Sequence, residues 1–97
     1  MTYDDFILTI ETDDQPPKLP LYLQALWHDA KGNWSKAHSL IDSLDDANSS
    51  WVHAYLHRKE GDVGNADYWY RRANKKRPAV SLNEEWQNLT AELLIKF

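Results

Sequence analysis

The chain has 97 residues, no cysteine and a formal net charge of −4 at pH 7. This length predicts one domain, residues 1–97, because domains commonly run about 100–150 residues. Without cysteine, disulfides and thiolate metal sites are excluded. The first residues are acidic, and no apolar run approaches the ~18 residues that cross a bilayer. We therefore expect a cytoplasmic protein that does not bind membranes.

Residues 1–17 are expected to form an N-terminal segment and a loop. Thr2 and Asp5 have the spacing of a helical capping box, and the apolar residues that follow lie on one face of a helix over residues 2–12. The β-branched residues among them leave a short strand as the alternative. Pro16 and Pro17 then predict a loop.

Residues 18–78 predict four helices joined by short turns. Gly32 and Gly61 are placed to end the first and third helices, and Asn33 and Asp62 to cap the second and fourth. The expected ranges are about Leu19 to Lys31, Trp34 to Leu44, Ala47 or Ser50 to Glu60, and from the Asp62 cap to about Lys76. Pro78 stops the last of them.

This central part contains the same pattern twice. Aligning Gly32 with Gly61 also places Ala25 on Ala54, His28 on His57, and Ala37 on Ala66. An apolar stripe with helical spacing repeats in the same register. Two units that repeat both their small residues and their stripe predict two stacked helical hairpins with a shared core.

The pattern resembles a tetratricopeptide repeat. That family has small residues where the two helices of a unit cross, a turn with Gly and a closing Pro, here Ala25, Gly32 and Ala37, then Ala54, Gly61, Ala66, Ala73 and Pro78. The period is shorter than the family's ~34 residues, and His53 stands at a normally apolar position. The segments HAYLHRKEGD and YWYRRA are also similar to those of small uncharacterised bacterial helical proteins. The resemblance implies an all-α fold of the right-handed superhelical type.

Residues 79–97 predict a final helix. Ser81 and Glu84 form a capping box, and the apolar residues that follow share one helical face. A stack of only two hairpins exposes an apolar end. We therefore expect this helix to cap the repeats.

The resemblance also implies a concave surface lined by the first helix of each unit. Carried over residue by residue, this surface contains Tyr22 and Asp29 in the first unit, and Trp51, Tyr55, Arg58 and Lys59 in the second. Because Trp, Tyr and Arg dominate binding hot spots, we expect a non-catalytic module that binds a peptide segment or a second copy of itself. In this arrangement Asp29 could pair with Arg58. Alternatively, Trp51 and Tyr55 pack under the N-terminal segment or the final helix.

A second hypothesis is a metal or small-ligand site, conceivably catalytic. His53 and His57 lie one helical turn apart, with Glu60 beyond them and His28 at the matching place in the first unit. Zinc accepts two such histidines and a carboxylate, although the H-E-x-x-H motif is absent. Half-buried imidazoles that form hydrogen bonds between helices would give the same sequence pattern. We expect no cofactor.

A third hypothesis is the binding of single-stranded nucleic acid, because aromatic and basic residues interleave in the segment YWYRRANKKR of the fourth helix. The acidic total charge disfavours it. The same residues are also expected in an amphipathic helix whose basic face is exposed to solvent. The sequence contains no motif for an activated nucleophile and none for a phosphate-binding loop. We therefore expect no enzyme activity.

Overall fold

A computed structural model describes all residues, 1–97, and contains six α helices and no strand. The all-α prediction is confirmed, and the strand alternative for residues 2–12 is wrong. The helices are α1 (Tyr3–Thr12), α2 (Leu21–Ala30), α3 (Trp34–Ile41), α4 (Ala47–Glu60), α5 (Val63–Arg72) and α6 (Leu82–Lys96). None of them is both long enough and apolar enough to cross a membrane.

The polar residues that precede five of the helices act as caps. The side chains of Thr2, Asn33, Asp46, Asp62 and Ser81 each accept a hydrogen bond from the backbone N–H three residues further on. Each bond satisfies a donor that the first helical turn leaves free. Only α2 begins without such a cap, after Pro20.

Two helices end earlier than the sequence pattern predicts. The helix α3 ends at Ile41 rather than Leu44, and α5 ends at Arg72 rather than Lys76. Asn74 explains the second case, because it adopts a left-handed conformation with φ 59°, which asparagine tolerates well. The N–H of Lys75 then donates to the carbonyl of Tyr70, at 2.8 Å, and closes the helix as a Schellman motif does. The basic run after Asn74 is therefore not helical.

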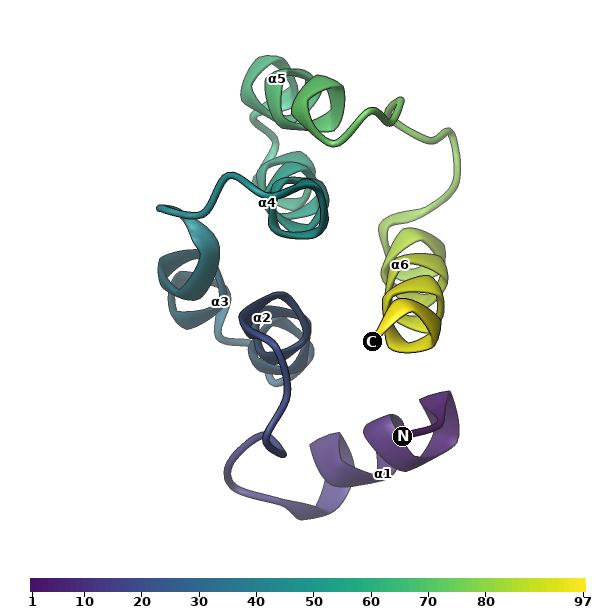
Figure 1. The fold of residues 1–97 in the computed structure, drawn as a ribbon. Helices are drawn as coiled ribbons and strands as arrows, with labels where there is room; N and C mark the ends of the chain where they lie inside the picture. Colours follow the sequence, from purple (N-terminus) through teal and green to yellow (C-terminus); the bar gives the residue numbers. More distant parts are fainter.

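The central helices pack as two neighbouring pairs, α2 with α3 and α4 with α5 (Figure 1). The alanines that the repeat aligns are buried, as close helix crossings require. Ala25 and Ala37 belong to the main core, whereas Ala54 and Ala66 form a smaller cluster with Tyr70. The main core contains residues of α1, α2, α3, α4 and α6, whereas α5 contributes to the smaller cluster.

The last helix covers the inner helices of the two pairs. In Figure 1, α6 lies beside α2 and α4 on the side away from α3, and α1 packs against α6. Trp86 of α6 is buried in the core with Leu26 and Tyr55, and its indole N–H donates to the Leu26 carbonyl at 3.1 Å. The helix α6 therefore fills the surface that the resemblance to tetratricopeptide repeats predicts to be concave.

Candidate functional site

Three of the residues expected on the concave surface form one hydrogen-bonded group. Asp29 of α2 accepts a bond from the Tyr55 hydroxyl at 3.1 Å and another from the Lys59 ammonium at 2.9 Å. Asp29 and Tyr55 are 3% and 2% exposed. Burial and the Asp29 carboxylate raise the pKa of Tyr55 well above its usual value, so its hydroxyl remains a donor. The group joins α2 to α4.

The predicted pair between Asp29 and Arg58 is wrong, because Arg58 points towards α6. Its guanidinium donates to Glu85 Oε1 at 2.7 Å and to the Val80 carbonyl. The other Glu85 oxygen accepts a bond from the Tyr70 hydroxyl. Arg58 is therefore bound within the chain.

Trp51 and Tyr22 form no hydrogen bond with either group. Trp51 is half-buried, and the Lys75 ammonium lies 4.2 Å from the centroid of its ring, with that of Lys96 at 5.7 Å. Tyr22 is half-buried against the main core. The six residues therefore do not line one common pocket.

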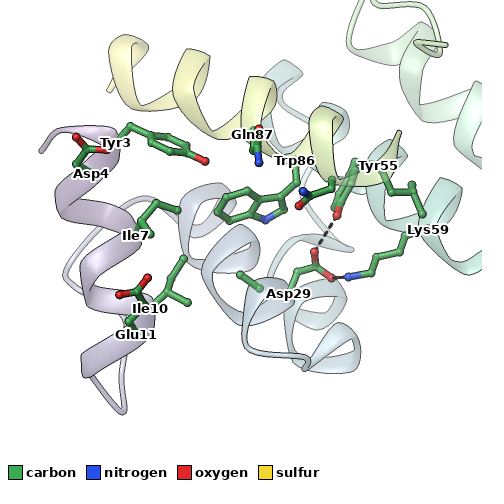
Figure 2. A pocket seen from close by; sticks show the side chains of 13 residues that line it. Tyr3, Asp4, Ile7, Ile10, Glu11, Asp29, Tyr55, Lys59, Trp86 and Gln87 are labelled. Carbon is green, nitrogen blue, oxygen red and sulfur yellow. Dashed lines mark hydrogen bonds and ion pairs between the residues drawn. The ribbon is translucent and has the colours of Figure 1, made fainter. Parts of the chain in front are cut away.

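A pocket of about 670 Å³ opens where α1 and α6 meet the ends of α2 and α4, within the ~300–1,000 Å³ typical of ligand sites. In Figure 2, Trp86 extends across its middle, with α1 side chains on one side and the Asp29–Lys59 pair on the other. Its lining comprises Tyr3, Asp4, Ile7, Ile10, Glu11, Asp29, Ala30, Tyr55, Lys59, Leu82, Asn83, Trp86 and Gln87.

The lining of this pocket combines aromatic rings with negative charge. Tyr3 and Trp86 meet edge to face, with ring centroids 6.5 Å apart. The carboxylates are those of Asp4, Glu11 and Asp29, and Lys59 is the one cation. Because that cation is already bound to Asp29, the pocket is acidic, whereas the sequence resemblance implies a basic binding face. Only the residues on α2 and α4 could be identified from the repeat pattern, since the α1 and α6 side depends on tertiary packing.

A cluster of three imidazoles lies between α3 and α4. The ligand nitrogens of His38, His53 and His57 all lie within 4.8 Å of one another, and the Nε2 atoms of His38 and His53 are 3.1 Å apart. The predicted set is therefore partly wrong. His28 is not in this group and packs against Trp27, whereas His38 was missed.

Two tryptophans enclose these imidazoles. Trp34 stacks on His38 with ring centroids 4.9 Å apart, and Trp69 stacks on His53 at 4.0 Å. Burial, together with the neighbouring His57 and His38, lowers the pKa of His53 to about 4. His53 is therefore neutral near pH 7 and keeps a nitrogen lone pair.

The aromatic residues of the basic segment are mostly engaged. Trp69 stacks on His53, and Tyr70 is buried with its hydroxyl on Glu85. Only Tyr68 of the three is exposed, and the Arg72 guanidinium lies 5.8 Å from its ring centroid. This face therefore offers one free ring, whereas single-strand binding uses a series of them.

Comparison with known proteins gave no relative. No protein-family model matches the chain, and no curated protein or solved structure matches it. The resemblance to tetratricopeptide repeats therefore rests on the sequence pattern.

Proposed function

We propose that this protein is a non-catalytic interaction module that binds a peptide segment in the pocket between α1 and α6. In this proposal, α2–α3 and α4–α5 are two tetratricopeptide-like hairpins of a right-handed superhelix, supported by the buried alanines at their crossings. The helix α6 takes the place of a bound peptide on their inner face and leaves a pocket at its edge. The cysteine-free composition agrees with a cytoplasmic module.

The observation that carries the proposal is the combination of aromatic rings and carboxylates in one pocket. Tyr3 and Trp86 supply ring surfaces, and Asp4 and Glu11 supply negative charge that no cation of the lining neutralises. A cation over an aromatic ring gains about 0.5–2 kcal/mol, depending on how far it is desolvated. The partner is therefore a peptide that inserts a lysine or arginine side chain.

The basic residues after α5 make a second copy of this chain one source of such a segment. Lys75 and Lys76 follow the end of α5, and Arg77 pairs with Asp67 at 2.9 Å. Self-association is a distinct outcome, because it would appear as a mass that rises with protein concentration. A peptide that competes for the pocket would dissociate the self-associated chains and lower this mass.

Selection of displayed random peptides against the full chain tests the proposal. We expect the enriched sequences to share a basic residue next to an apolar or aromatic one. Binding of a selected peptide should weaken about tenfold in the Asp4→Asn, Glu11→Gln double variant, since tenfold corresponds to about 1.4 kcal/mol. Both positions are exposed, so this variant is expected to fold normally.

A matched double variant controls for net charge. Asp14→Asn with Asp45→Asn removes the same charge at exposed loop positions outside the pocket. It should leave the affinity within about twofold, because neither side chain lines the pocket. Enrichment of acidic peptides whose binding needs Arg71 and Arg72, or equal effects of the two double variants, would contradict the proposal.

A further inference from the structure

The histidine cluster brings three imidazole nitrogens from two helices to one point. His53 and His57 lie one turn apart on α4, and His38 reaches them from α3. Zinc binds imidazole nitrogens at about 2.0–2.1 Å, which places two ligands of a tetrahedral site about 3.3 Å apart. The 3.1 Å between the Nε2 atoms of His38 and His53 is close to this value. Small side-chain rotations would bring in His57, whose ligand nitrogen is within 4.8 Å of the others.

Carboxylates on the far side of two rings resemble those that orient metal-binding histidines. His57 Nδ1 lies 2.6 Å from Glu60 Oε1. Because a carboxylate accepts this bond, the proton is on Nδ1, and in the neutral ring the Nε2 lone pair of His57 is free for a metal. Asp42 lies on the Nδ1 side of His38, at 3.9 Å. Metal-bound histidines characteristically donate their second N–H to a carboxylate or carbonyl, as His57 does to Glu60, whereas 3.9 Å is too long for such a bond from His38.

The third ring, His53, has no hydrogen bond to any group outside the cluster. His53 is 3% exposed, and its Nδ1 is buried without a hydrogen-bond partner. A buried polar atom without a partner is uncommon in folded proteins. Since its Nε2 contacts only His38, His53 is free to take the tautomer that a ligand at the cluster requires.

We propose that His38, His53 and His57 form a binding site for a divalent transition-metal ion, of which zinc is the test case. Three neutral nitrogen ligands suit zinc, copper and nickel and exclude calcium or magnesium, which prefer oxygen. Three protein ligands leave a coordination position for water, and His38, a quarter exposed, lies on the solvent side. The metal would link α3 of the first pair to α4 of the second.

Zinc titration of the full chain, purified without a histidine tag and followed by calorimetry, tests this site. We expect one zinc per chain and a rise in melting temperature, because an ion that binds only the folded chain stabilises it. Cobalt should give the absorption bands of a four-coordinate ion. His38→Gln should weaken zinc binding at least tenfold, and Glu60→Gln, at an exposed position outside the three ligands, by about tenfold.

His28→Gln is the matched control, because it removes an imidazole outside the cluster. Its zinc affinity should stay within about twofold of the original chain. The competing explanation is a hydrogen bond between His38 and His53 with no metal role. Absence of zinc, cobalt and copper binding by the folded chain, or equal affinities of the His28→Gln, His38→Gln and Glu60→Gln variants, would overturn the proposal.

Discussion

Arg58 of α4 and Glu85 of α6 form an ion pair, with Nη1 and Oε1 2.7 Å apart and side chains that are 17% and 4% exposed. Tyr70 of α5 donates to the second carboxylate oxygen of Glu85. One carboxylate thus connects three helices. This connection ties α6, which lines one side of the acidic pocket, to α4 and α5.

Loss of the Glu85 carboxylate should destabilise the fold markedly. Glu85→Ala leaves the Arg58 guanidinium and the Tyr70 hydroxyl without their partner, and breaking such a buried pair costs about 3–5 kcal/mol. Glu84→Ala, at an exposed neighbouring position, should change the free energy of unfolding by no more than about 0.5–1 kcal/mol. Urea unfolding followed by circular dichroism measures both. Similar values for the two variants would show that the pair does not hold α6.

Alkaline pH should unfold the chain through its buried tyrosines. Burial raises the pKa of Tyr55 and Tyr70, and the bond to Glu85 and the charge of Asp29 add to the effect. Unfolded tyrosine ionises near pH 10, so above this pH the folded state binds more protons than the unfolded state, and stability falls as pH rises. Part of the tyrosinate absorbance should appear only together with loss of helix. Full ionisation near pH 10 with the helices intact would contradict this account.

Two glycines should respond to alanine with opposite signs. Gly61 ends α4 with φ 92°, whereas Gly64 lies within α5, and an added Cβ meets no atom within 4 Å at either position. Backbone conformation therefore decides the outcome. Gly61→Ala should cost about 1–2 kcal/mol in the left-handed region, and Gly64→Ala should stabilise by about 0.5–1 kcal/mol. Melting temperatures that move in the same direction would contradict the assigned turn.

Helix positions could be predicted from sequence because their signals are local. Caps such as Asn33 and Ser81 act within one turn, and the glycine at the end of α4 adopts the expected left-handed conformation. The early end of α5 also had a signal, since Asn74 is a residue that tolerates this conformation. The basic residues that follow Asn74 led us to extend the predicted helix past it, to about Lys76.

The partners of the functional residues could not be predicted from the same signals. Arg58 and Lys59 are consecutive, and which of them reaches Asp29 depends on where α6 lies. No periodicity within the repeats specifies that position. His38 was missed because its relation to His53 is a contact between helices. Its one local signal was Trp34, one turn earlier on the same helix.

The proposed function requires a cationic peptide to enter the pocket between α1 and α6. Nuclear magnetic resonance of the labelled chain, titrated with a selected basic peptide, tests it most directly. We predict the largest shift changes at Tyr3, Ile7 and Lys59 and at the indole N–H of Trp86, all in the pocket lining. Changes confined to the basic residues of α5, with these signals unmoved, would contradict the claim.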